Sequence, residues 1–553
     1  MKISHALIIL VCAAFLAAFL FYPLIYSLRA AFISGGDISF EPFGLLLQDP
    51  EFYHLLFNSI NLAFLSTFLA CLLALPLAVV MERVSLPRKK IFHIILLFPL
   101  ILPPFVGAIG IRKLFARFGP INLSLMHSDI ISEPINWLTE SGLSGIAIVE
   151  ALHLYPIVYL NLRASLRAAD PALDEAAISV GAGKLRRFFR ITVPMLAPGF
   201  FSGAVLAWIW AFTDLGTPLV FDYQQLLPAR LFQIADEIHS NPLGFCIVIM
   251  MLLVIAAMLL LSKAAVGIEL YRPLANSGRP AQQASLSPLL QGVVILLLSA
   301  ASLIVILPHA AVILTSLADK WFITVIPEEL GLEAYVSVVS HPLTASSIRN
   351  SLFLSSASAV LDFILGICLA WLITRRRRKW TGWLDAAAMA PLAVPGIIIS
   401  FGYLGGFSNT SLDPRLSPFP LLIIGYAVRR LPFMVRSAAA GFQQASPQLE
   451  EAAYSVGASA VMTARRVTFP IMKAHLLTGA ILCFCFAMLE VSESLILAVQ
   501  EHHYPMTKAM YSLLSRPDGE STASALGVIG MLVLAAGMLA AARLTAKKEK
   551  MEP

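Results

Sequence analysis

Residues 170–181 read DPALDEAAISVG, and residues 446–457 read SPQLEEAAYSVG. In both copies a residue that commonly caps helices is followed by a proline, which favours the first turn of a helix. A glycine ends each stretch, and glycine suits the position just past a helix end because it adopts left-handed backbone at little cost. Each copy therefore predicts a short helix that ends at Gly181 or Gly457.

The two copies belong to a duplication that covers most of the chain. Asn58-Ser59 and Gly110 recur, at one constant offset, as Asn350-Ser351 and Gly402. A repeat of this length indicates two homologous halves. The predicted domains are a first half over residues 1–266, a polar, basic cytoplasmic linker over 267–287 and a second half over 288–553.

The composition places both halves in a membrane. Of the 553 residues, 58% are hydrophobic and 13% are charged, whereas a soluble protein carries about 25% charged residues. Soluble enzymes and nucleic-acid-binding proteins are therefore excluded, despite a net charge of +6. A helix needs about 20 apolar residues to cross a bilayer, so we expect an all-α polytopic membrane protein with about twelve transmembrane helices, six in each half. The expected spans are 5–28, 57–81, 91–111, 143–163, 196–220, 243–265, 288–317, 350–374, 383–407, 417–437, 472–499 and 521–543.

The basic residues predict how the spans are oriented. Most lysines and arginines fall in every second loop, including those over residues 163–190 and 429–466, while many acidic residues fall in the opposite loops. Cytoplasmic loops carry the excess of lysine and arginine. Both termini and both copies of the repeated helix are therefore expected in the cytoplasm.

The duplicated loop resembles the signature of permease subunits of binding-protein-dependent ABC importers. That signature is Glu-Ala-Ala, three residues, Gly, nine residues, Ile, one residue and Leu-Pro; Val193 replaces the leucine in the first copy, and Val467 and Phe469 replace the isoleucine and leucine in the second. The resemblance implies the fold of those permeases and, in each loop, a coupling helix that docks onto a nucleotide-binding subunit. An amphipathic helix lying on lipid is the alternative. The implied coupling residues are Glu175, Ala176, Ala177, Gly181 and Pro194 in the first loop, and Glu451, Ala452, Ala453, Gly457 and Pro470 in the second.

The resemblance also implies partners. Gly181-Ala-Gly-Lys184 lacks the first glycine and the Ser or Thr of a phosphate-binding loop, so we expect no nucleotide site and no bound cofactor in this chain. ATP and Mg would be used by two separate ABC ATPase subunits on the cytoplasmic side. A periplasmic or lipid-anchored substrate-binding protein would deliver the substrate to this subunit in a bacterial inner membrane, in contact with lipid and with no nucleic acid.

Ionisable residues inside spans are candidates for a translocation path. Asp214 and Glu490 occupy equivalent positions in the fifth span of each half, and Glu493 follows one turn later. These acids either line the path and attract a cation, or hydrogen-bond the backbone of a broken helix. Glu150 and His153 share a helix face, a spacing that resembles half of a metal site. The repeat has Tyr426 and Arg429 at these positions, which favours a hydrogen-bonded pair instead.

The substrate is less well defined. The fused two-half form resembles the ferric-iron branch of these importers, and iron(III) prefers oxygen ligands such as carboxylates. Arg112, Lys113 and Arg117 at the outer end of the third span would instead suit a phosphorylated anion. Ferric iron is the prediction, and an organic phosphate, a phosphonate or thiamine is the alternative. A secondary transporter driven by an ion gradient is the alternative from another class, but it does not explain the repeated loop.

Overall fold

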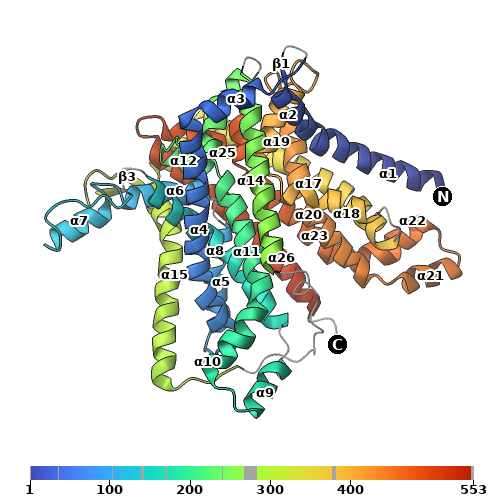
Figure 1. Ribbon diagram of the computed structural model, residues 1–553, viewed down its shortest axis with the longest axis horizontal. Helices are drawn as coiled ribbons and strands as arrows, with labels where there is room; N and C mark the ends of the chain where they lie inside the picture. The colour runs from blue at the N-terminus through green and yellow to red at the C-terminus, as the bar shows by residue number, and fades with distance from the viewer. Residues whose placement is uncertain are drawn as a thin grey trace. The chain divides into compact units, whose positions relative to one another are not determined.

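The computed structural model describes residues 2–34, 37–101, 104–138, 142–168, 171–238, 241–266, 283–376 and 381–549. The strands found there form two short antiparallel hairpins, β1 (Ile33–Ser34) with β2 (Asp37–Ile38) and β3 (Ala318–Lys320) with β4 (Glu329–Leu330). All other regular elements are helices (Figure 1). The predicted all-α membrane fold is confirmed, while most of the expected linker, residues 267–282, lies outside the described residues.

Nine helices in the described part of the chain are long and apolar enough to cross a membrane. Lipid offers no hydrogen-bond partners, and a helix can cross it because its backbone N–H and C=O groups bond to each other. They are Leu7–Phe32 (α1, Lys2–Leu16, to α2, Tyr22–Phe32), α4 (Pro50–Arg83), α8 (Leu143–Ala168), Leu185–Thr213 (α10, Lys184–Arg187, to α11, Val193–Thr213), α14 (Leu243–Val266), α15 (Pro288–Ser316), α17 (Pro342–Arg375), Ala460–Met488 (α22, Ala460–Thr463, to α23, Phe469–Met488) and α26 (Gly519–Glu549).

The expected third span of each half, 91–111 or 383–407, is a bent pair of helices. In the first half, α5 (Lys89–Leu96) and a 3-10 turn (Phe98–Ile101) meet α6 (Pro104–Leu114) at 95°. Prolines at each bend cannot donate to a helix backbone, so the helix breaks there. If each bent pair is counted as one span, the described residues hold up to eleven. The second half repeats the bend at 99° between α18 (Thr381–Met389) and α19 (Gly396–Gly406).

The helix at the expected span 417–437 is not an apolar span. Every 18-residue stretch of α20 (Phe419–Gln444) contains Arg429, Arg430 and Arg436. The first two had been assigned to a cytoplasmic loop, but Arg430 is buried against other helices. A helix with this many charges is stable in a membrane only where protein groups pair with them.

The fifth span of each half also ends earlier than expected. The predicted spans 196–220 and 472–499 are interrupted, because α11 ends at Thr213 and α23 ends at Met488. A short helix follows each break, α12 (Gly216–Val220) in the first half and α24 (Ser492–Leu497) in the second. The shorter helices elsewhere are α3 (Glu41–Gln48), α7 (Pro120–His127), α9 (Pro171–Ser179), α13 (Leu227–Gln233), α16 (Glu333–Ser340), α21 (Pro447–Ser455) and α25 (Met506–Leu514).

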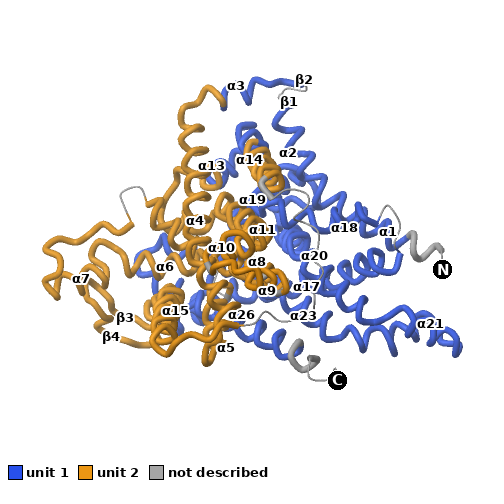
Figure 2. The backbone as a smooth tube through the Cα atoms, turned by 60° about the horizontal axis from the view of Figure 1, so that its bottom comes forward, with its two compact units in different colours: residues 1–46, 231–249, 333–553 blue, residues 47–230, 250–332 orange. Residues whose placement is uncertain are grey.

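Packing divides the chain into two compact units (Figure 2). Unit 1 contains residues 1–46, 231–249 and 333–553, and unit 2 contains residues 47–230 and 250–332. Within unit 1, α2 packs against α19; within unit 2, α15 packs against α6. The first span of each half therefore packs on the bent third span of the other half. For this reason the two compact units do not coincide with the two repeated halves of the sequence.

Candidate functional site

The first candidate coupling helix, α9, ends in a Schellman motif. The N–H of Ala182 donates to the carbonyl of Ala177 at 2.9 Å, and the N–H of Gly181 donates to Ile178 at 2.9 Å. Gly181 has a φ of +77°, the left-handed conformation that this motif requires. The helix end predicted at this glycine is therefore confirmed. The second copy has the same geometry, with Gly457 (φ +84°) donating to Tyr454 at 3.0 Å and Ala458 donating to Ala453 at 3.0 Å.

The start of the second candidate coupling helix, α21, differs from the prediction in detail. Ser446 occupies the N-cap position of α21 and Pro447 its first turn, but the serine side chain makes no capping hydrogen bond. Instead, α21 is attached through Glu450, which accepts from the Arg375 guanidinium at 3.0 Å and from Thr468 at 3.2 Å. Asp170, the predicted cap of α9, lies outside the described residues.

The helix that follows each coupling helix passes through one turn of π-helix. These turns are Phe188–Thr192 and Ala464–Thr468, and the next residue, Val193 or Phe469, donates its N–H five residues back. Pro194 and Pro470 come directly afterwards, and a proline ring crowds the carbonyl four residues before it. A wider π turn accommodates that crowding, so the loop continues into the span without a break.

Apolar side chains are exposed on both coupling loops. Val180 is 81% exposed and Val456 is 85% exposed. Both valines come directly before the glycine with left-handed backbone, at the end of α9 or α21. Figure 1 shows α9 at the lower edge of the view, below α10. The predicted coupling residues Glu175, Ala176, Gly181, Pro194, Glu451, Ala452, Gly457 and Pro470 are exposed, and Ala177 and Ala453 are half-buried.

Asp214 lies at the break between α11 and α12. One carboxylate oxygen accepts from the N–H of Gly216 at 3.2 Å, and the other accepts from Thr217 at 3.0 Å. At the other end of α12, Arg112 donates to the carbonyl of Val220 at 2.5 Å. A negative charge at the first turn and a positive charge at the last turn both stabilise a helix. Asp214 therefore binds broken-helix backbone, one of the two roles that the sequence left open.

The other basic residues at the outer end of α6 contact aromatic rings. The Lys113 ammonium lies 5.5 Å from the centre of the Trp321 ring, and the Arg117 guanidinium lies 5.9 Å from that of Phe118. Arg112 and Arg117 are nevertheless exposed. This surface of unit 2 consequently keeps its positive charge.

Glu490, the equivalent of Asp214 in the second half, is held by two arginines. One carboxylate oxygen accepts from Arg429 at 2.6 Å and the other accepts from Arg430. Arg430 also donates to the carbonyl of Phe486 at 2.8 Å. Glu490 is 6% exposed, so both of its oxygens are engaged in a buried ion pair. Sequence reasoning missed these partners, although a buried acid generally needs a base nearby.

Glu493 has a different environment, one turn further along in α24. It is completely buried, and neither carboxylate oxygen has a hydrogen-bond partner among the described residues. Its neighbour Ser494 donates to the carbonyl of Glu490 at 2.5 Å and lies 2.6 Å from the Tyr426 hydroxyl. The three predicted path acids thus have different environments. Asp214 caps a helix, Glu490 forms an ion pair, and Glu493 is buried without a hydrogen-bond partner among the described residues.

A cation also lies near the end of α24. Lys508 of α25 donates to the carbonyl of Leu495 at 2.8 Å, and its ammonium lies 5.1 Å from the centre of the Phe232 ring. Burial lowers the pKa of Lys508 to about 8. The two short helices after the breaks therefore share one feature, a basic side chain on a carbonyl near their C-terminal ends.

The duplicated Asn-Ser pairs now have a structural role. Ser59 accepts from the N–H of Leu227 at 2.9 Å, and Asn58 donates to the carbonyl of Gln225 at 3.3 Å. These bonds attach α4 to the start of α13. The second half is attached in the same way, because Ser351 accepts from Met506 at 2.8 Å and Asn350 donates to Tyr504 at 3.2 Å.

Glu150 and His153 do not form the expected hydrogen-bonded pair. Glu150 accepts from Ser66 at 2.6 Å through one oxygen, and its other oxygen has no partner among the described residues. The His153 ring faces the bend of the third span, where Nδ1 lies 3.0 Å from the carbonyl oxygen of Pro99. No group of three or more His, Cys, Asp or Glu able to hold a metal occurs in the described part of the chain.

Comparison with known proteins identifies the family. The model of the binding-protein-dependent transport system inner membrane component matches residues 42–268 and 363–549. A ferric transport system permease protein of Actinobacillus pleuropneumoniae is 24% identical over 531 residues, covering 94% of this chain and 75% of that protein. A putative ferric transport system permease protein of Haemophilus influenzae is 23% identical, covering 87% and 76%. A molybdate/tungstate transport system permease protein of Pyrococcus furiosus is 31% identical over 186 residues, covering 34% and 72%. The chain belongs to the family of inner membrane components of binding-protein-dependent transport systems, and it carries the permease domain of that family twice.

Proposed function

We propose that this chain is the translocation subunit of an ABC importer that carries ferric iron from a binding protein into the cytoplasm. Two separate ATPase subunits hydrolyse ATP, one on each coupling loop, and this chain binds no nucleotide. Both termini lie in the cytoplasm, on the side of the coupling loops. The observation that carries the proposal is the pair of equivalent helices, α9 and α21, each ended by a left-handed glycine.

The matching geometry of the two loops supports a pair of identical or closely similar ATPases. Exposed Val180 and Val456 occupy equivalent positions, directly before the two glycines. Burial of an exposed apolar side chain against a partner removes apolar surface from water and so favours binding. The family assignment favours this arrangement over a secondary transporter, which needs no such partner.

The names of two relatives support iron as the substrate. Iron(III) prefers oxygen ligands, and Asp214 is the one predicted path acid that is only half-buried. An oxyanion or phosphorylated solute is the second candidate. The exposed guanidinium groups of Arg112 and Arg117 favour it, as does the relative named for molybdate and tungstate.

Reconstitution tests the proposal. The full chain is purified from its native membranes with its associated subunits and placed in liposomes with its binding protein, and uptake of radioactive ferric iron is measured with and without enclosed ATP. We expect uptake that requires ATP and two ATPase subunits per chain. ATP-independent uptake by the chain alone would contradict the coupling. Uptake of molybdate or a phosphate ester in place of iron would identify the second candidate.

A further inference from the structure

We propose that a groove between α17 and α23, within unit 1, binds one anionic phospholipid. The groove has a volume of about 530 Å³. Residues of α17, of the π turn Ala464–Thr468 and of the first half of α23 line it. The site is separate from the predicted path acids, and it does not depend on which substrate is transported.

One face of a continuous helix, Ala460–Met488, forms most of the groove. Arg465, Phe469 and Lys473 follow one another at intervals of four residues, and Leu477 continues the same stripe. Residues three and four apart are neighbours on a helix surface. At 1.5 Å per residue the stripe is about 18 Å long, and half of a bilayer's hydrocarbon core is about 15 Å thick. The stripe is therefore long enough to follow one lipid from its headgroup into the membrane.

The end of the groove nearer the coupling helix α21 is basic. Arg465 and Lys473 are exposed there, and neither forms an ion pair or a hydrogen bond with another described residue. Side chains on a helix tilt toward its N-terminus, which is the end nearer α21. A lysine at this depth lays its stem on apolar surface and extends its ammonium toward the headgroups. Both cations are therefore available to a single anionic headgroup.

The other end of the groove is apolar. Leu476 is buried in a hydrophobic cluster, and the half-buried ring of Phe363 in α17 packs against the same cluster. Phe363 comes twelve residues before Arg375, or about 18 Å along the helix. Arg375 marks the end of α17 nearest α21, because it donates to Glu450 of that helix at 3.0 Å. The apolar end of the groove thus lies away from the coupling helix, where an acyl chain would run.

Charge complementarity selects the occupant. Arginine and lysine form strong hydrogen bonds with phosphate oxygens, and basic pockets between membrane helices bind anionic lipid headgroups. The carboxylate of Glu450 lies beside the groove, where it accepts from Thr468 at 3.2 Å, but it is paired with Arg375. It therefore leaves the positive charge of Arg465 and Lys473 uncompensated. A phospholipid with a net negative charge satisfies both the cations and the apolar end.

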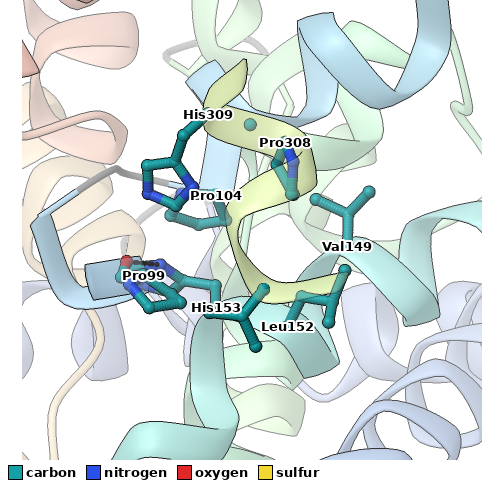
Figure 3. Close-up of a pocket in the computed structure, with 9 residues that line it drawn as sticks. Pro99, Pro104, Val149, Leu152, His153, Pro308 and His309 are labelled. Atoms are coloured by element: carbon teal, nitrogen blue, oxygen red, sulfur yellow. Dashed lines mark hydrogen bonds between the residues drawn. The ribbon is translucent and has the colours of Figure 1, made fainter. Parts of the chain in front are cut away.

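The first half of the chain lacks this site. Phe189 and Ala197 occupy the positions equivalent to Arg465 and Lys473, so neither cation is repeated. A cavity beside the bend of that half's third span (Figure 3) has a volume of only about 20 Å³, enough for about one water molecule. We therefore expect one site of this kind per chain, in the second half.

Native mass spectrometry tests the proposal, because it counts the lipids that remain bound to a protein. The full chain is purified in detergent, washed free of lipid and titrated with dioleoyl phosphatidylglycerol. We expect one molecule to bind more tightly than any other. Dioleoyl phosphatidylcholine, which has the same acyl chains but no net charge, should bind much more weakly. Inorganic phosphate at millimolar concentration should not displace the phosphatidylglycerol; displacement would overturn the proposal by showing a site for a free anion.

Variants locate the site. Arg465→Gln and Lys473→Gln should each weaken phosphatidylglycerol binding about fivefold, and the double variant about 25-fold, which is the contribution of one or two cations near a membrane surface. Both side chains are exposed, so the melting temperature of the lipid-free double variant should match that of the parent. Arg466→Gln is the matched control, because this neighbouring arginine is also exposed but does not line the groove. It should leave the affinity unchanged.

Equal affinity for the two lipids would overturn the proposal. So would a double variant that keeps the affinity of the parent, or an Arg466→Gln variant that loses as much affinity as Arg465→Gln. The last result would assign binding to the overall surface charge and not to the groove. None of these measurements involves ATP-dependent uptake, so this proposal and the proposed function fail separately.

Discussion

Gly402 of α19 lies against the backbone of Pro23 in α2: a Cβ atom added at residue 402 would lie 2.7 Å from the Pro23 carbonyl oxygen. Unit 2 contains the equivalent contact, where a Cβ at Gly110 of α6 would lie 2.7 Å from the Cβ of Ala311 in α15. Both glycines are members of the duplication. Each permits the first span of one half to cross the third span of the other at backbone distance.

Gly402→Ala should therefore destabilise the protein. The added methyl group meets backbone atoms that cannot rotate away, and overpacking of this kind costs about 1–3 kcal/mol. Thermal unfolding in detergent measures the effect. Gly382→Ala is the matched control, because nothing lies within 4 Å of its added Cβ. Equal melting temperatures for the two variants would show that α2 and α19 are not in backbone contact at Gly402.

Gly181→Val and Gly457→Val should reduce binding of the ATPase subunits. A left-handed conformation costs a residue other than glycine about 1–2 kcal/mol, and nothing lies within 4 Å of an added Cβ at either position. The effect is thus confined to the backbone at the end of the coupling helix. Co-purification of ATPase subunits measures it. Gly183→Val is the control, because it places a side chain of the same size nearby at a position without positive φ. This variant should bind the ATPase subunits normally. If it lost as much binding, the size of the side chain and not the backbone conformation would be responsible.

Glu490→Gln should destabilise the protein strongly, by about 3–5 kcal/mol, because it leaves the buried Arg430 without its charge partner. Asp214→Asn should have little effect on stability, since asparagine also caps helices, whereas Asp214→Ala should cost about 1 kcal/mol. Thermal unfolding separates these outcomes. A Glu490→Gln protein with normal stability but severely reduced iron uptake would instead place this carboxylate in the translocation path.

Asp413, in the loop between α19 and α20, should contribute to stability at neutral pH. A hydrogen bond from the Arg415 guanidinium, at 2.6 Å, holds the pKa of Asp413 well below its usual range. A carboxyl group with a lowered pKa in the folded state stabilises above its unfolded pKa, about 3.9, and this contribution is lost as the pH falls further.

Asp413→Asn should accordingly lower stability by about 1 kcal/mol at pH 7, since its partner is partly exposed to water. As the pH falls below about 4, the difference in melting temperature between the variant and the parent should shrink progressively. Melting curves between pH 7 and pH 3 test this. A constant difference over the whole range would show that the hydrogen bonds, and not the charge, are responsible.

The sequence was sufficient wherever local chemistry determines structure. The end of α9 at Gly181 and that of α21 at Gly457 follow from a glycine after a short helical stretch, and both have the expected left-handed backbone. Nine of the twelve expected membrane spans follow from apolar length. These features depend on a few neighbouring residues, so one sequence is enough to predict them.

Features that depend on distant residues were missed. The repeated prolines, among them Pro99 and Pro391, were visible in the sequence, but the bend angle at each depends on which helices pack beside it. The pairing of Glu490 with Arg429 and Arg430 joins residues about sixty positions apart. The count of basic residues in each loop assigned those arginines to the cytoplasm, because such a count cannot detect that a charge is neutralised inside the protein.

The crossing of α2 on α19, and of α15 on α6, has a consequence for assembly. A chain cut within the linker would give two fragments, each lacking the helix that covers its own bent span. Each fragment would leave one face of its bent span uncovered, and assembly of the two would depend on their concentration in the membrane. In the intact chain the tether supplies a high effective concentration instead, so a fused polypeptide assembles at any expression level.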